Sequence, residues 1–435
     1  MPLHAGALPS SAGKCIVQRN PEDELPAALS HIRICDFTGQ LAGAGATRHL
    51  AAFGAQVIRI EDPTNQGKWD TLRGGPPYKD ERRGIELGGA FNNHNVEKLG
   101  ITLNVKTARG KELLTRLIGI SDVVAENFAA GVLDRWGFGF AAMQKIKSDI
   151  IYVSNCGFGH LGPYKPYKSW GSIVQAVSGL TSLAGLPGMQ PSGWGMSYMD
   201  HTGGYYQALA ILLALVHRNR TGEGQWVDMS CIEAGTCLTG PAILDYTVNG
   251  REFRREGNPD SNHNTWPAMA PHGIYRAKED DTWVAIACRD WRDWKGLSGV
   301  VNEAWTAEPR FATLEARLVN QAALDEKVDA WTRRRDPFAT AQLLQRAGVP
   351  ASAVQTPGQR IDHDDNTTAW GLWPTVTHRE MGEVRVDGMP VHLSETDWSI
   401  ENGAPCLGQH NEQVYGGLLG MSSSEIDRLH EEGVI

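Results

Sequence analysis

Short runs rich in Ile and Val alternate with amphipathic segments through the first half of the chain. Each apolar run has the length of a buried strand, and the segments between them carry the spacing of helices. This alternation predicts an α/β fold, in which parallel strands are joined by covering helices. We expect strands over 32–37, 56–61, 100–104, 122–126, 149–154 and 226–229, a loop opening into a helix over 39–53, a helix over 108–118 and a helix starting over 132–137.

The pattern changes in the second half of the chain. Residues 240–265 are polar and irregular and predict a linker. Beyond them, strands over 272–275 and 283–288 form a hairpin around a charged turn, and helical segments follow to about 347. This part is predicted to be a smaller second domain. A strand over 348–354, a helix over 425–432, an extended arm over 1–30 and a long functional loop over 64–94 complete the expected elements.

The most apolar stretch is Ala208–Val216, which is too short to span a bilayer and predicts a buried helix. Asp200 stands just before it, followed by Gly203 and Gly204. Two interpretations of Asp200 stay open. It is an ordinary helix N-cap, or it is a nucleophile that the helix N-terminus keeps ionised. In the second case the two glycines would let a ligand approach closely.

Composition narrows the functional classes. A chain of 435 residues suggests two domains or one elaborate domain. The formal net charge of −9, without any Lys/Arg block, argues against nucleic-acid binding. Seven cysteines without a CxxC pair predict reduced thiols of a cytoplasmic protein and no zinc site. The N-terminal residues carry no apolar signal-peptide segment.

Glycines after the first strand raise the question of a dinucleotide site. The segment is Gly43-Ala-Gly45-Ala-Thr-Arg48, so Arg48 replaces the third glycine of the nucleotide-binding fingerprint. Its bulk would obstruct tight packing of helix on strand. A nicotinamide oxidoreductase is therefore kept only as an outside alternative, to be tested by NAD(P)H titration.

Several motifs in a fixed order resemble the family III CoA-transferases of the CaiB/BaiF type. This group includes formyl-CoA, carnitine and benzylsuccinate CoA-transferases and, more distantly, α-methylacyl-CoA racemase. The resemblance runs from about residue 33 to the C-terminus. The motifs are DFTGQLAGAGAT (36–47), GAQVIRIE (54–61), NVEKLGITLNVKT (95–107), SDVVAENFAAGVLDRWGFGF (121–140), GFGHLGPY (157–164), QAVSGL (175–180), the block from MDHTGG to RTGEGQWVD, AGVPASAV (347–354) and LGQHNEQVY (407–415).

The resemblance implies a subunit of two domains. A large Rossmann-like, CoA-binding domain would be built from both chain ends, over 31–235 and 348–435. A linker over 236–265 would lead to a small α+β domain over 266–347. Two ring-like subunits would interlock as a dimer, either of this chain alone or with a related family III subunit.

The resemblance also implies the chemistry. Asp200 takes the place of the family nucleophile, which attacks an acyl-CoA thioester and passes through an aspartyl anhydride and an aspartyl-CoA thioester. The substrates would be an acyl-CoA, such as succinyl-CoA, and an organic acid. No metal and no permanently bound cofactor are expected. Residues matching the CoA-binding positions are Gln40, Leu41, Ala42, Leu103, Lys106, Asn127, Phe128, Val132, Arg135 and Lys168.

The chain departs from the family in the loop before QAVSGL. An acid is often found four positions before Gln175, but Gly171 stands there, after Trp170. ENFAAG also lacks the arginine of the family's ENFRPG. Two alternatives therefore stay open beside an active transferase. The chain is a weakly catalytic or non-catalytic subunit of a heteromeric, benzylsuccinate-type enzyme, or it is an acyl-CoA racemase that lacks one of two proton-transfer groups.

Overall fold

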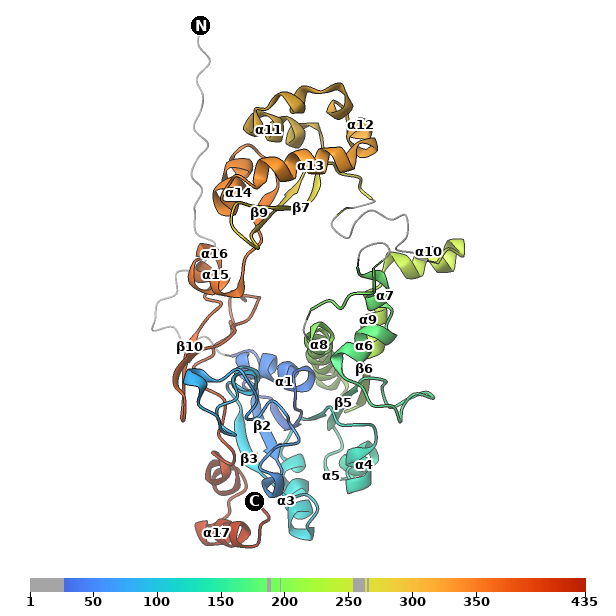
Figure 1. Ribbon diagram of the computed structural model, residues 1–435. Coiled ribbons are helices and arrows are strands. Elements are labelled where there is room, and N and C mark those ends of the chain that lie inside the picture. Colours follow the sequence, from blue (N-terminus) through green and yellow to red (C-terminus); the bar gives the residue numbers. More distant parts are fainter. Residues whose placement is uncertain (1–26, 186–188, 196, 253–262, 264–265) are drawn as a thin grey trace. The chain divides into compact units, whose positions relative to one another are not determined.

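The computed structural model describes residues 27–185, 189–195, 197–252, 263 and 266–435 (Figure 1). The predicted N-terminal arm falls outside these residues except at 27–30. The chain forms two compact units, each assembled from separate segments. Of the described residues, the first unit comprises 27–171, 197–234 and 371–435, and the second comprises those between 172 and 195 and between 235 and 370.

A six-stranded sheet forms the centre of the first unit, with the order β3-β2-β1-β4-β5-β6 and every neighbouring pair parallel. This is the strand order of a doubly wound nucleotide-binding sheet. The predicted α/β class and all six predicted strands are confirmed. The strands are β1 (Arg33–Phe37), β2 (Gln56–Glu61), β3 (Leu99–Thr102), β4 (Val123–Glu126), β5 (Ile151–Cys156) and β6 (Trp226–Ser230).

Two apolar layers cover the sheet on opposite faces, because alternate strand residues point to opposite sides. On one side, Ile34, Val57 and Val153 pack with helices α1 (Ala42–Ala52) and α8 (Tyr198–Thr221). On the other side, Phe37, Ile60 and Tyr152 pack with a helical layer that includes the C-terminal segment. That layer contains α3 (Ala108–Gly119), α4 (Val132–Trp136), α5 (Phe140–Ile146), the π-helical η5 (Glu412–Leu418) and α17 (Ser423–Glu431).

The remaining elements of the first unit lie in its connections. A hairpin of β10 (Thr375–His378) and β11 (Gly382–Arg385) packs through Val376 and Val384 near the end of α1. The predicted loop over 64–94 is only partly irregular. It begins with η1 (Pro63–Asn65), continues through η2 (Lys79–Glu81) and ends in a short helix, α2 (Gly89–His94).

The second unit has its own core around a three-stranded antiparallel sheet, with the order β7-β8-β9. Its buried residues include Val284, Trp331 and Leu344. The expected hairpin is confirmed, as is the following helical run. The elements are β7 (His272–Arg276), β8 (Trp283–Ala287), α11 (Trp291–Val301), η3 (Ala304–Ala307), η4 (Pro309–Phe311), α12 (Leu314–Val319), α13 (Gln321–Thr332), α14 (Pro337–Arg346), β9 (Ala351–Ala353), α15 (Pro357–Asp362) and α16 (Asp365–Trp370).

The prediction that 240–265 is wholly irregular is wrong, because a helix, α10 (Pro241–Asn249), begins it. Pro241 at the first helical position and Gly250 after the last residue mark its ends, which is the usual asymmetry of helix termini. The polar residues that follow had masked this signal. Three short helices complete the structure, namely α6 (Gly171–Val177), α7 (Leu180–Leu183) and α9 (Cys231–Cys237).

Candidate active site

The strand order reverses direction between β1 and β4, and ligands of doubly wound sheets bind where the loops diverge at such a point. The loop after β1 contains Gly39, and the loop after β4 begins with Asn127. The Gly39 N–H donates to Asn127 Oδ1 over 2.8 Å, and Asn127 Nδ2 donates to the Gly39 carbonyl over 3.0 Å. This reciprocal pair joins the predicted CoA residues 40–42 to Asn127 and Phe128.

Trp69 closes the same corner, although no pattern in the sequence had assigned it a role. Its ring lies 4.8 Å from that of Phe128. A Cβ atom on Gly39 would stand 2.4 Å from the Trp69 ring, so only glycine fits there. Gln40 has a left-handed backbone, with φ of 55°, and its side-chain Nε2 donates to the Trp69 carbonyl over 3.2 Å. Trp69 therefore supports the loop after β1 by packing against Gly39 and binding Gln40.

Glu126 supports the other loop. Its Oε2 accepts a hydrogen bond of 2.6 Å from the Phe128 N–H, and its Oε1 accepts one of 2.9 Å from the Tyr152 hydroxyl. Burial raises the pKa of Glu126 to about 8. His160 is also buried here, with its backbone N–H and Nδ1 on Asp228 and its Nε2 3.6 Å from Glu126. These contacts give His160 a structural role beneath the loop.

Asp200 lies in the first turn of α8. Ser197 occupies the N-cap and Asp200 is the third helical residue, so the interpretation of Asp200 as an ordinary N-cap is wrong. Burial raises the pKa of Asp200, and this outweighs the lowering by a Ser197 hydrogen bond and by nearby His201. The net direction is opposite to that expected from the helix terminus alone. Among the described residues, no lysine or arginine lies within salt-bridge distance of Asp200.

Gly203 and Gly204 allow close helix packing rather than close ligand approach, which corrects the sequence-based interpretation. A Cβ on Gly203 would stand 2.6 Å from Cys231 Sγ, and one on Gly204 would stand 2.8 Å from the Ala42 carbonyl oxygen. Gly204 follows Asp200 by one helical turn, roughly 6 Å along the axis. The contact with α1 therefore brings Asp200 close to the loop that contains Gln40, Leu41 and Ala42.

Gly171 also borders Asp200. A Cβ atom built on Gly171 would lie 2.4 Å from Asp200 Oδ2. The position at which the sequence departs from the family that it resembles is thus in direct contact with the candidate nucleophile. The sequence had marked Gly171 only as a missing acid, whereas the structure shows that the space of its side chain is already occupied.

The other predicted CoA-binding residues are less closely associated with Asp200 and with the Gly39–Asn127 pair. Leu103 is 1% exposed and belongs to the core, so only its backbone could reach a ligand. Val132 begins α4, and the exposed Arg135 donates to the Ala130 carbonyl. Lys106 is exposed and pairs with Asp62 over 3.1 Å. Lys168 lies on the exposed loop after β5. No contact ties these cations to Asp200.

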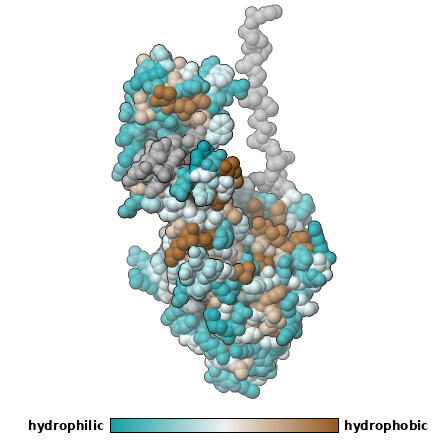
Figure 2. Space-filling view, turned by 90° about the vertical axis from the view of Figure 1, so that its right-hand side faces the viewer, coloured by the Kyte–Doolittle hydropathy of each residue, from teal (hydrophilic) through white to brown (hydrophobic). Residues whose placement is uncertain are grey.

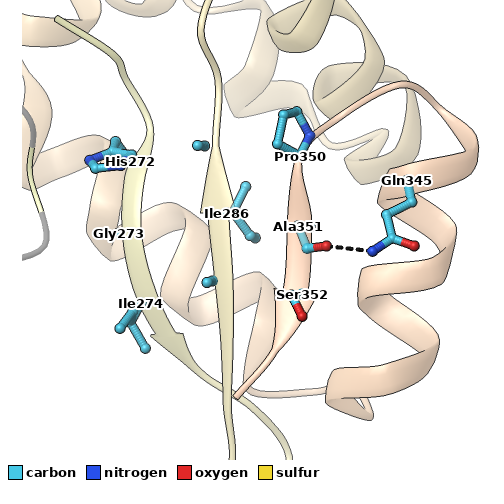
Figure 3. Close-up of a pocket in the computed structure, with 10 residues that line it drawn as sticks. His272, Gly273, Ile274, Ile286, Gln345, Pro350, Ala351 and Ser352 are labelled. Atoms are coloured by element: carbon cyan, nitrogen blue, oxygen red, sulfur yellow. Dashed lines mark hydrogen bonds between the residues drawn. The ribbon is translucent and has the colours of Figure 1, made fainter. Parts of the chain in front are cut away.

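A cavity of about 610 Å³ lies on the sheet of the second unit (Figure 3). Residues of all three strands line it, with Gln345 of α14 at one side, where its amide donates to the Ala351 carbonyl over 2.7 Å. Of the described residues that line it, His272 alone carries an ionisable side chain. It contains none of the predicted site residues, and we do not assign the chemistry to it.

One side of α8 carries an exposed apolar stripe, which corrects the prediction that Ala208–Val216 is wholly buried. Ile211 and Leu215 face the sheet, whereas the opposite side of the helix is open. Apolar side chains form patches on the face shown in Figure 2. The stripe consists of Tyr205, Leu209, Leu212, Leu213 and Val216, of which Leu213 is 62% exposed.

The glycines of α1 serve the packing of this corner. A Cβ on Gly43 would stand 2.6 Å from both Asn127 and Thr38.

Within the described residues, no cluster of three or more His, Cys, Asp or Glu side chains could hold a metal ion. The same part of the chain contains no helix that is both long and apolar enough to cross a membrane. All of its cysteines are free thiols.

The sequence of this chain matches one protein-family model and is similar to several proteins of known name. The model of "CoA-transferase family III" matches residues 29–411. The chain is 31% identical to a succinyl-CoA–D-citramalate CoA-transferase of Chloroflexus aurantiacus, covering 94% of this chain and 98% of that protein. It is 32% identical to a formyl-CoA:oxalate CoA-transferase of Streptomyces avermitilis, with coverage of 94% and 99%.

A solved structure has the same fold. The crystal structure of a CAIB/BAIF family protein from Brucella suis superimposes with a TM-score of 0.79 at 29% identity. The match covers 89% of this chain and 98% of that one. The family match spans most of the sequence, and the named relatives are CoA-transferases. The chain therefore belongs to CoA-transferase family III and is a CoA-transferase.

Proposed function

We propose that the chain transfers CoA from an acyl-CoA donor to an organic acid through covalent intermediates on Asp200. An Asp200 oxygen attacks the thioester carbonyl, giving an aspartyl–acyl anhydride and CoA thiolate. The thiolate attacks the aspartyl carbonyl, giving an aspartyl-CoA thioester and releasing the donor acid. The acceptor carboxylate then attacks that thioester, and the returning thiolate attacks the acceptor carbonyl, which regenerates Asp200. Each step exchanges one acyl bond for another, and no net proton is needed.

The environment of Asp200 is the observation that carries this proposal. Its carboxylate is partly withdrawn from water, yet no lysine or arginine of the described chain neutralises it. A carboxylate with few hydrogen-bond partners loses little on becoming an acyl group, so its reaction is not opposed by broken ion pairs. Structural acids in a protein interior are commonly paired with cations, as Glu61 and Asp70 are in this chain.

The position of Asp200 fits a CoA thioester. The Gly204–Ala42 contact sets its helix turn near the loop after β1, and the Gly39–Asn127 pair joins that loop to Phe128. We propose that CoA lies along Gln40, Leu41, Ala42, Asn127 and Phe128, with Lys106, Val132, Arg135 and Lys168 farther out and Leu103 acting from the core. The relatives' names include succinyl-CoA, D-citramalate and oxalate, so we propose succinyl-CoA as donor and a dicarboxylic acid as acceptor.

The test compares two acids associated with α8. Asp200→Asn should lower the transfer rate at least about a thousandfold, because the neutral amide cannot supply the attacking oxygen. The affinity for CoA, measured by calorimetry, should stay unchanged. Glu223→Gln, an exposed acid just beyond the other end of the helix, should leave the rate as it is. Full activity of Asp200→Asn would refute the proposal.

We further propose that a second subunit covers the apolar stripe of α8, either another copy of this chain or a related one. Exposed apolar stripes of this kind commonly mark interfaces. The large and small domains, predicted over 31–235 with 348–435 and over 266–347, are proposed to correspond to the first and second units, with residues 348–370 assigned to the second because β9 pairs with β8. A cytoplasmic location is also proposed, and the free thiols support it. Light scattering of the purified chain should give the mass of a dimer. A monomer that transfers CoA would contradict the dimer.

A further inference from the structure

Gly171 is the first residue of α6 and its Cα faces the Asp200 carboxylate. A Cβ atom at this position would lie 2.4 Å from Oδ2, 3.0 Å from Cγ and 3.3 Å from Oδ1 of Asp200. These three atoms are the nearest to it. Non-bonded carbon and oxygen atoms do not approach to 2.4 Å, so a methyl group at position 171 and the carboxylate cannot both occupy their places.

The backbone gives no reason for a glycine here. Gly171 does not have a positive φ, so a residue with a side chain could adopt its backbone conformation without strain. Nor does a neighbouring backbone atom press on this position more closely than Asp200 does. The contact with Asp200 therefore distinguishes Gly171 from glycines such as Gly204, which pack against backbone.

We propose that Gly171 is a positioning residue for Asp200, whose missing side chain provides the space in which the nucleophilic carboxylate lies. The inference rests on the proposed function of Asp200 and deepens it. Any side chain at position 171 would turn the carboxylate away from α6 and redirect its attacking oxygen. The glycine is thus part of the active arrangement, and the acid missing at this position is no sign of an inactive subunit.

Kinetics give the first test. A shift of the attacking atom by about 1 Å can slow a reaction a hundredfold without weakening the binding of substrate. Gly171→Ala should therefore lower kcat about tenfold or more and leave the KM for acyl-CoA unchanged. Gly417→Ala is the matched control, because Gly417 is helical and a Cβ there would meet no atom within 4 Å. A Gly171→Ala enzyme with kcat within about twofold of wild type would overturn the inference.

A second test needs no activity. In an Asp200→Ala background the added methyl group meets no carboxylate, so Gly171→Ala should raise Tm by about 1–2 °C, because alanine lowers the conformational entropy of the unfolded chain. In the wild-type background the rise should be absent or reversed. Equal Tm changes in the two backgrounds would overturn the inference and leave the transferase proposal standing. Full activity of Asp200→Asn would instead overturn the proposed function itself.

Discussion

Two regions of the first unit contain carboxylates that are wholly or partly buried. The regions differ in whether arginine side chains pair with these carboxylates. Beside β2, Glu61 and Asp70 are fully buried with Arg59 and Arg73. Arg59 contacts Asp70 over 2.8 Å, and Arg73 contacts Glu61 over 2.6 Å. At the start of α8, Asp200 has only a hydroxyl and the neighbouring His201 to lower its pKa.

This difference in pairing separates acids that stabilise the structure from the acid proposed to react with substrate. A buried carboxylate paired with guanidinium groups is costly to disturb, because removing either partner leaves the other charge unpaired. The buried network thereby ties the segment after β2 to the sheet, and Asp70 and Arg73 lie in the same connection as Trp69. In the proposed mechanism Asp200 stays reactive because no lysine or arginine of the described residues neutralises it. The comparison predicts that replacing a paired acid lowers the stability of the protein, whereas replacing Asp200 lowers its activity.

The largest expected effect on stability comes from the network. Asp70→Ala should lower the free energy of unfolding by about 3–5 kcal/mol, since it leaves the Arg59 charge buried without its closest carboxylate. Urea unfolding monitored by tryptophan fluorescence measures it. The control is Glu112→Gln in the exposed Arg109–Glu112 pair, which should cost less than about 1 kcal/mol. Equal losses in the two variants would remove the basis of the comparison.

A smaller effect, on the affinity for CoA, is expected at Asn127, whose neutral amide joins the loops after β1 and β4. Asn127→Ala removes both hydrogen bonds to Gly39, each worth about 1 kcal/mol. The dissociation constant for CoA, measured by calorimetry, should rise about tenfold, while the protein stays folded. Asn127→Asp retains the acceptor for the Gly39 N–H and should fall between wild type and the alanine variant. Unchanged CoA affinity in Asn127→Ala would show that the loop contact does not shape the CoA site.

Glu126 gives a third environment, because it is a buried acid to which the described part of the chain offers no lysine or arginine partner. Burial raises its pKa from 4.5 to about 8, while the Phe128 and Tyr152 hydrogen bonds oppose the rise and Asp134 and Asp228 add to it. The unfolded chain loses its proton near pH 4.5 and the folded chain near pH 8. Stability should therefore fall as the pH rises through this window, and level off above it.

The pH dependence can be isolated with one substitution. Wild-type unfolding free energy should fall by up to about 1.4 kcal/mol per pH unit from this group. Glu126→Gln retains the size of the side chain and should give a flatter curve between pH 5 and pH 8. Urea unfolding at several pH values measures both curves. A Glu126→Gln curve that parallels wild type would show that Glu126 is not the titrating group.

Much of the fold was predictable from local pattern. The strands of the parallel sheet appeared as largely apolar runs, because the inner strands of such a sheet are covered on both faces. Helix α10 was missed because the polar residues after Gly250 dominated that region. The open side of α8 was also missed, since Leu209 and Leu213 are as apolar as Ile211 and composition alone cannot say which of them faces the sheet.

The site was predictable only in outline. Motif order selected Asp200, and the strand pattern placed Asn127 after a strand. The contacts that define the site join residues distant in the sequence, such as Gly39 with Trp69 and Gly171 with Asp200, and no local pattern reports them. The direction of the Asp200 pKa also depends on burial, which the helix-terminus argument alone could not include.

Trapping the covalent intermediate tests the central claim most directly. The chain is mixed with succinyl-CoA, quenched with hydroxylamine, digested and analysed by mass spectrometry. Hydroxylamine attacks the activated aspartyl carbonyl, so the account predicts a hydroxamate at Asp200 that forms only when acyl-CoA is present and is absent from Asp200→Asn. An active enzyme that carries no modification at Asp200, or carries it at another residue, would contradict the account.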